Sequence, residues 1–422
     1  MKRPLPWLLA ALLVAALRLG TPVAKIMTDG AEYLNLAVQG FAPGAHIAAP
    51  FAYRFAVPVV VHLAAALTGS SPRDLFPLVV LLSGFGLLMA AYALARQAGA
   101  ARRNALIVML ITASSLFAVR FPLYCPFDVD IEACLVACAA FACFRRGSPV
   151  AALAVSLVGL LFKEFLAAPL AALAAMWILE YARERTLRPL RLLTLMVVLA
   201  AALFILPRVL IPVTSSFGTI TEYRLTAPSR TLYFTQLRMF LAWPPKPGAL
   251  LNIALALLSF WLPVAMLWTP SRGSALARSA GNDRIPLLAW LIAVTGLMTV
   301  GGTKIMVFAV YTAPLLIAAL AVLLETGPSA AEMIFVTAAT ALFNRIVLPL
   351  GSPGGDPGVD IGFYGAYGLE ASDTTAWRFA EAAGWMAAAG LVRAWRGGRR
   401  DPPARTGAIA NPSDLPGEHE RR

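Results

Sequence analysis

The chain has few charged residues and few cysteines for its 422 residues. Only 14% of its residues are charged, whereas about a quarter are charged in a typical water-soluble globular protein. Hydrophobic residues make up 59% of the sequence, and the mean hydropathy is +0.74. The four cysteines provide no disulfide framework, because three lie in one apolar stretch and Cys125 stands apart. The composition therefore excludes a soluble globular domain and indicates a bilayer protein.

Apolar stretches long enough to cross a bilayer as helices recur from Leu5 to Trp395. They are rich in Ala, Leu, Gly and Pro and do not alternate polar with apolar residues, which excludes a transmembrane β-barrel. We predict an all-α polytopic transmembrane helical bundle over residues 1–396, followed by a Pro-rich, polar, disordered cytoplasmic tail over 397–422. The predicted spans are about twelve: 5–23, 75–95, 105–120, 131–144, 148–162, 165–181, 191–211, 249–268, 286–300, 305–324, 330–350 and 378–396.

The placement of the basic residues predicts that both termini are cytoplasmic. With that orientation, 21 of the 35 Lys and Arg residues fall on the inner side and ten on the outer side, as the positive-inside rule requires. The net charge of +13 therefore reflects topology and indicates no nucleic-acid partner. The apolar segment 50–69 contains Arg54, Pro58 and His62, so we interpret it as an interfacial or re-entrant helix.

Acidic residues gather on the predicted outer side. The segment TDGAEYLNLAVQG, just beyond the first span, contains Asp29, Glu32 and Tyr33, which share one side at helical spacing. We interpret Asp29 and Glu32 as candidates for chemistry at the outer membrane face. The alternative is that Thr28 or Asp29 only caps a surface helix.

A second acidic group lies in the loop FPLYCPFDVDIEAC, between the third and fourth spans. Asp128 and Asp130 are two residues apart, followed by Glu132, and such carboxylates can converge on a metal ion or on a cationic partner. The alternative is a set of solvated loop charges.

Two lysines follow the same outer pattern. Lys163 and Glu164 lie in the apolar hairpin GLLFKEFLAAP, where charges are costly and therefore suggest function, with a mutual ion pair as the alternative. Lys304 follows two glycines at the start of a span, which suits a phosphate, although a lysine reaching for the interface would look the same.

Four outer segments, 24–74, 121–130, 212–248 and 351–377, are predicted to form the site. Segment 212–248 supplies Arg224, Arg230 and Arg238 among aromatic residues. Segment 351–377 combines glycines and prolines with Tyr364 and Tyr367. Aromatic faces suit sugar rings, but aromatic residues are also common at membrane interfaces.

The order of these features resembles the GT-C superfamily of polytopic glycosyltransferases, which includes protein O-mannosyltransferases and lipid A aminoarabinose transferases. The resemblance rests on an acidic residue after the first span, an aromatic and arginine segment opening an apolar stretch, an acidic pair in an outer loop, and later lysines. The residues at these places are Asp29, Tyr53, Arg54, Pro58, Asp128, Asp130, Lys163, Lys304 and Pro314. It covers residues 5–181 recognisably and the remainder by topology.

The resemblance implies that the chain moves a sugar from a polyprenyl phosphate to a hydroxyl of a lipid, glycan or protein acceptor at the outer face, with inversion. Asp29 would be the general base. Glu32, Asp128 and Asp130 would orient the acceptor, and Asp128 and Asp130 are the residues that would hold an optional divalent cation such as Mg²⁺ or Mn²⁺. The cations for the donor phosphate would be Arg54, Lys163, Arg224, Arg230 and Lys304.

Two other functions fit the sequence less well. A transporter of a small or lipid-linked substrate would also need charges among Gly/Pro-interrupted helices, but these charges lie at helix ends and the sequence has no repeated half. A non-catalytic membrane protein with the same scaffold is the third reading. The Ala- and Arg-rich composition favours the cytoplasmic (inner) membrane of a bacterium.

Overall fold

The computed structural model describes residues 4–21, 28–42, 44–217, 222–229, 247–300, 305–346 and 375–397. Arg230, Lys304, residues 351–374 of the last outer segment and the predicted tail from 398 onward therefore lie outside the described residues.

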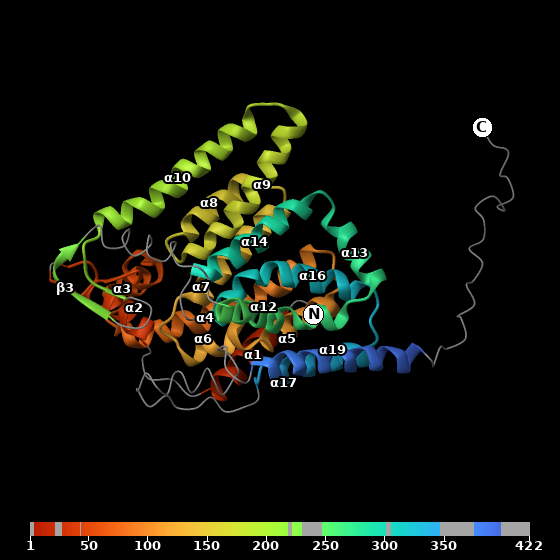
Figure 1. The fold of residues 1–422 in the computed structure, drawn as a ribbon. Helices are drawn as coiled ribbons and strands as arrows, with labels where there is room; N and C mark the ends of the chain where they lie inside the picture. Colours follow the sequence, from red (N-terminus) through yellow and green to blue (C-terminus); the bar gives the residue numbers. More distant parts are fainter. Residues whose placement is uncertain are drawn as a thin grey trace, which may run out of the picture.

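Helices make up most of the described chain (Figure 1). The longer ones are α1 (Leu5–Leu19), α2 (Thr28–Gln39), α3 (Ala56–Thr68), α4 (Pro72–Gln97), α5 (Arg102–Ala113), α7 (Asp130–Arg145), α8 (Pro149–Gly159), α9 (Ala167–Glu184), α10 (Arg188–Leu210), α12 (Pro247–Leu267), α13 (Pro270–Ala280), α14 (Arg284–Val300), α16 (Ala313–Glu325), α17 (Ala330–Phe343) and α19 (Thr375–Gly397). The short ones are η1 (Phe51–Tyr53), the π-helical turn η2 (Leu116–Arg120), α6 (Phe121–Tyr124), η3 (Glu164–Leu166), η4 (Gly281–Asp283), α15 (Ile305–Phe308) and η5 (Ala309–Thr312).

The helical architecture confirms the predicted fold class. Every predicted span overlaps a helix. Four of the described helices are long and apolar enough to cross a membrane, and a fifth crossing results if α5 and the segment Phe117–Tyr124, bent by 69°, count as one. The four are Pro72–Gln97, Glu164–Glu184, Arg188–Leu210 and Leu250–Leu267. Several other apolar helices are shorter, so the number of about twelve crossings stays a prediction.

The segment 50–69 forms η1 and α3. The 13 residues of α3 extend about 20 Å at 1.5 Å per residue, which is less than the ~30 Å of a hydrocarbon core. The helix packs against α2 and α4, and the Ala56 N–H donates to the Leu161 carbonyl (3.2 Å). Its length agrees with the interpretation that it does not cross the bilayer alone.

Side-chain caps and a glycine mark several helix boundaries. The Ser71 Oγ accepts a hydrogen bond from the Arg73 N–H at the start of α4, and the Ser329 Oγ accepts one from the Glu332 N–H at the start of α17, both at 3.2 Å. These contacts satisfy donors that a helix start leaves unpaired. Gly69 ends α3 at φ +70°, in the left-handed region that glycine enters without strain.

A small sheet joins two of the predicted outer segments, and the sequence did not predict it. Strand β2 (Val213–Phe217) pairs in parallel with β1 (Ala48–Ala49) and antiparallel with β3 (Glu222–Ser229). The Thr214 N–H donates to the Ile47 carbonyl at 2.7 Å. The strands are short, and their pairing depends on a contact across more than 160 residues, which local sequence cannot reveal.

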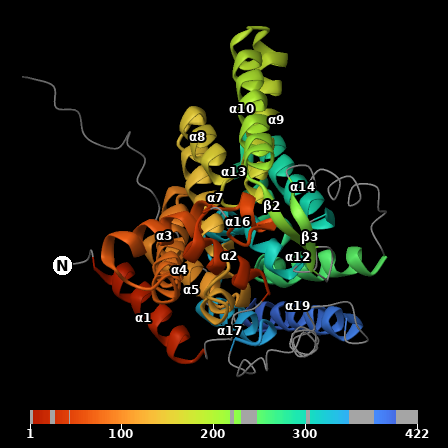
Figure 2. The ribbon, with the colours of Figure 1, turned by 90° about the vertical axis from the view of Figure 1, so that its left-hand side faces the viewer.

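The buried core lies where α4, α5, α7, α12, α14 and α16 pack together. Figure 1 shows the β2 and β3 strands at one end of the molecule and α13 at the other, and Figure 2 views the molecule from the strand end. α13, in a segment predicted to be cytoplasmic, was not predicted as a helix. Its composition is polar enough to resemble a loop, and it forms because tertiary contacts stabilise it.

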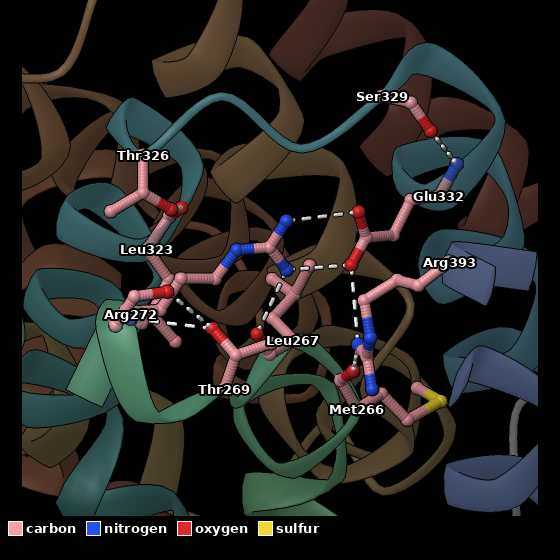
Figure 3. A network of polar contacts seen from close by, with 10 residues as sticks. Met266, Leu267, Thr269, Arg272, Leu323, Thr326, Ser329, Glu332 and Arg393 are labelled. Carbon is pink, nitrogen blue, oxygen red and sulfur yellow. Dashed lines mark hydrogen bonds and ion pairs between the residues drawn. The ribbon is translucent and has the colours of Figure 1, made fainter. Parts of the chain in front are cut away.

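Those contacts are a network centred on Glu332, which Figure 3 shows. Arg272 of α13 donates to both carboxylate oxygens of Glu332, at 2.6 and 3.0 Å, and Arg393 of α19 donates to one of them at 3.2 Å. Arg272 also donates to the Leu267 carbonyl at the end of α12 (2.9 Å), and Arg393 to the Met266 carbonyl. One carboxylate therefore connects α13, α17 and α19, and its two arginines reach α12.

We predict that Glu332→Ala destabilises the protein far more than an ordinary surface substitution. The change leaves two arginines without their carboxylate, and breaking a buried ion pair costs about 3–5 kcal/mol. The measurement is the thermal unfolding midpoint in detergent, with Glu184→Ala, at the exposed end of α9, as the matched control. Equal midpoints for the two variants would contradict the role of the network.

Candidate functional site

One region of the structure brings together polar residues from segments that are far apart in sequence. The first turn of α2 packs on the loop before α7. A Cβ built on Gly30 would lie 2.9 Å from the Cβ of Phe127, so only glycine allows this approach. Asp29 and Asp128, the neighbours of these two residues in sequence, are thereby brought to the same region.

Tyr33 is the buried residue that joins these carboxylates to a cation. Its ring has no solvent exposure, and the Arg54 Nη1 donates to its hydroxyl at 3.3 Å. Burial raises the pKa of the Tyr33 phenol, the Arg54 charge opposes this, and the negative charges of Asp128 and Asp29 raise the pKa further. Tyr33 therefore keeps its proton at neutral pH and lies within the electric field of all three charged groups.

Glu164 lies between two arginines. Its Oε2 contacts the Arg54 Nε at 2.8 Å, and its Oε1 contacts the Arg208 Nη2 at 3.3 Å. The Arg208 guanidinium, at the end of α10, also lies over the rings of Tyr53 (4.8 Å) and Phe204 (3.6 Å). Glu164 therefore holds two guanidinium groups close together.

Lys163 and Asp130 form a second, neutral group. The Lys163 Nζ contacts the Asp130 Oδ1, and the Tyr311 hydroxyl donates to the same oxygen at 2.6 Å. Lys163 and Asp130 are only 2% and 3% exposed. Phe165 stacks between Phe308 and Tyr311, with ring centroids 4.5 and 4.7 Å away. The aromatic packing shields this ion pair from water, which strengthens it.

A third contact connects α2 to the small sheet. The His46 Nε2 lies 3.3 Å from the buried Glu32 carboxylate and 3.4 Å from the Ser215 Oγ of β2. The His46 Nδ1 lies 3.5 Å from the Thr214 Oγ1. Arg224, on the neighbouring strand β3, is the Cα partner of Ser215 and is exposed.

The structure brings six of the predicted site residues into these groups and the α2 contact: Asp29, Glu32, Arg54, Asp128, Asp130 and Lys163. Arg224 lies on β3, whereas Arg230 and Lys304 lie outside the described residues. The chemical roles predicted for all nine stay predictions.

Two of the structural alternatives are wrong, and one is compatible with the structure. Asp128 and Asp130 are buried and are not solvated loop charges. Lys163 and Glu164 do not pair with each other, because their backbone directions send them to Asp130 and to the two arginines. α2 does begin at Thr28, so Asp29 also lies where a negative charge stabilises a helix start.

Sequence reasoning missed three residues of the site. Arg208 was placed within a span, His46 was not considered, and Tyr311 had no motif to mark it. An arginine near the outer end of an apolar helix was the only available signal, since charges inside membranes are rare and usually paired. The contacts of His46 with Ser215 and of Tyr311 with Asp130 span 169 and 181 residues of sequence.

The carboxylates do not assemble a set of metal ligands in the part of the chain that the structure describes. No three His, Cys, Asp or Glu side chains lie together there in positions to share an ion. The Asp130 Oδ1 accepts from Lys163 and Tyr311. These groups do not fit Mg²⁺ or Mn²⁺, which need several oxygen ligands. The divalent cation predicted at Asp128 and Asp130 stays a prediction, and the proposed reaction uses no metal ion.

Comparison with known proteins identifies the fold. No protein-family model matches the chain, and no curated protein matches it in sequence. Its structure is similar to the crystal structure of ArnT from Cupriavidus metallidurans bound to undecaprenyl phosphate, with a TM-score of 0.51 over 92% of this chain and 77% of that one. The chain has a divergent GT-C-like fold. The two sequences are 14% identical, so the similarity between the two proteins is one of architecture.

The ion pair in the neutral group should show strong coupling between its two residues. We predict that Lys163→Met and Asp130→Asn each lower the thermal unfolding midpoint, because each leaves one buried group without its partner. The double variant should be less destabilised than the sum of the two, with a coupling of about 0.5–3 kcal/mol. Thermal unfolding of the four proteins measures this, and additive effects would show that the pair is not formed.

Proposed function

We propose that this protein transfers a sugar from a polyprenyl-phosphate donor to an acceptor hydroxyl at the outer face of the bacterial cytoplasmic membrane, with inversion at the anomeric carbon. The observation that carries the proposal is the nearness of acid and cation: Tyr33 lies in the field of Asp29 and Asp128 and its hydroxyl accepts a hydrogen bond from Arg54. The ArnT structure supports the donor class, since it was solved bound to undecaprenyl phosphate.

Asp29 serves as the general base in this proposal. It lies in the first turn of α2 and is partly exposed, so an acceptor hydroxyl can approach it from outside. Glu32, one turn further along, is buried and held by His46, and Asp128 is buried as well. Among these three carboxylates, Asp29 is therefore the most accessible to an acceptor.

The reaction forms one bond and breaks one. The acceptor oxygen attacks the anomeric carbon, and the bond from that carbon to the phosphate oxygen breaks. The acceptor proton passes to the Asp29 carboxylate, and the polyprenyl phosphate leaves as an anion. A positioned carboxylate base contributes about 10²–10⁴ to the rate of such a step.

The Arg54–Glu164–Arg208 group stabilises the leaving phosphate. Its Arg54 contacts the hydroxyl of Tyr33, and the phenol of Tyr33 lies in the field of Asp29, so base and cation belong to one region. Glu164 orients both guanidinium groups, which fixes their donors before the charge develops. Lys163 is neutralised by Asp130 and is therefore a weaker phosphate ligand than its charge suggests.

The decisive prediction concerns Asp29. We expect Asp29→Asn to lower sugar transfer by about 10²–10⁴ and to leave donor binding intact, because the amide cannot accept the proton but fills the same volume. The measurement uses purified protein in lipid, a panel of radiolabelled polyprenyl-phosphate sugars, and separate readings of label transfer and donor binding.

Asp74→Asn is the matched control, since Asp74 is an exposed carboxylate in the first turn of α4, outside the site. Equal transfer by the Asp29→Asn variant and the wild type would remove Asp29 as base. If the protein neither binds nor consumes any donor in the panel, its likeness to GT-C proteins is one of architecture only. Substrate flux across the membrane would then be the activity to measure.

Arg54 should affect the donor more than the acceptor. We predict that Arg54→Met raises the KM for the donor at least tenfold and also lowers kcat, because it removes a charge-assisted contact worth about 1.5–3 kcal/mol and frees Glu164 to repel the phosphate. Steady-state kinetics with each substrate varied separately measures this. An unchanged donor KM would show that the phosphate binds elsewhere.

A further inference from the structure

The inner half of α10 has one face that no other part of the described chain covers. Only 11% of the apolar window of this helix is buried, and Figures 1 and 2 show the α9–α10 hairpin projecting beyond the other helices. A shallow depression of about 480 Å³ lies on this face. Its lining is Leu187, Leu190, Arg191, Thr194, Leu195 and Val198.

The depression is mostly apolar and has a few polar groups. Arg191 and Thr194 are polar, whereas Leu187, Leu190, Leu195 and Val198 are apolar. From Arg191 to Val198 the helix rises about 10 Å. A ligand that fills the depression therefore needs an anionic or polar group and an apolar body.

Positive charge is concentrated at the same end of the hairpin. Four arginines lie close together in sequence at the end of α9 and the start of α10, and all are exposed: Arg183, Arg185, Arg188 and Arg191. Within the described residues none of the four makes an ion pair with a carboxylate, although Arg185 lies 6.0 Å from the ring of Tyr181. Unlike Arg272 and Arg54, these cations have no internal partner.

We propose that this depression binds an anionic glycerophospholipid of the inner leaflet, with the phosphate at Arg188 and Arg191 and an acyl chain along Leu195 and Val198. The positive-inside arrangement places the four arginines at the cytoplasmic headgroup layer, where anionic lipids attract basic residues. A free phosphate would leave the apolar part unfilled, and a zwitterionic lipid would leave the charge unbalanced. The inference needs only the fold and does not rest on the proposed transferase activity.

The test is native mass spectrometry of the purified protein with phosphatidylglycerol or phosphatidylcholine added to the detergent. We expect the wild type to retain phosphatidylglycerol in preference to phosphatidylcholine. The Arg188→Gln/Arg191→Gln variant should bind it roughly thirtyfold more weakly, since each arginine near an anionic lipid contributes about 1 kcal/mol. Arg278→Gln, an exposed arginine on α13, is the matched control and should bind as the wild type does.

A second variant tests the apolar part without changing the charge. Val198→Trp fills the depression with an apolar ring and should also weaken phosphatidylglycerol binding, while its thermal unfolding midpoint without added lipid stays that of the wild type. The proposal is overturned if both variants retain phosphatidylglycerol as the wild type does, if phosphatidylcholine binds equally well, or if glycerol phosphate competes with the lipid at equal concentration.

Discussion

Pairing of buried charges is the constraint on which the rest of this structure depends. A charge removed from water near a bilayer costs several kcal/mol unless an opposite charge and hydrogen bonds accompany it. Glu164 lies between Arg54 and Arg208, and Asp130 accepts from Lys163 and Tyr311. Each of these contacts connects helices that are distant in sequence. The need to pair these buried charges therefore decides how these ends of the helices pack together.

The same constraint acts at the other end with a different result. There Glu332 is shared by Arg272 and Arg393, which secures α13, α17 and α19 to each other. The Glu332 network has two arginines around one glutamate, and its arginines also bond to carbonyls of α12, so it stabilises the fold. The Glu164 group has the same composition, but there Arg54 also contacts the phenol of Tyr33, which lies in the field of Asp29 and Asp128. These nearby carboxylates distinguish the candidate site from the structural network.

The sequence revealed more about where the site lies than about how it is made. Asp29, Asp128, Lys163 and Arg54 were recognised because charges in an apolar sequence are rare, and rarity needs no tertiary information to be seen. Their partners were not recognised. A mutual ion pair of Lys163 and Glu164 was the alternative to a functional role, but Lys163 pairs with Asp130 and Glu164 with Arg54 and Arg208. Arg208, His46 and Tyr311 entered the site only through tertiary contacts, with Glu164, Glu32 and Asp130 respectively.

The sequence by itself determined the membrane character and the helical class, and each predicted span overlaps a helix. These properties follow from local composition, from hydrophobic length and from the distribution of Lys and Arg. Only the tertiary structure decided the β1–β2–β3 pairing, the ion-pair partners and the burial of Asp128 and Asp130. The physical reason is that each of these depends on which surfaces meet when α2, α7 and α10 pack, and no single segment contains that information.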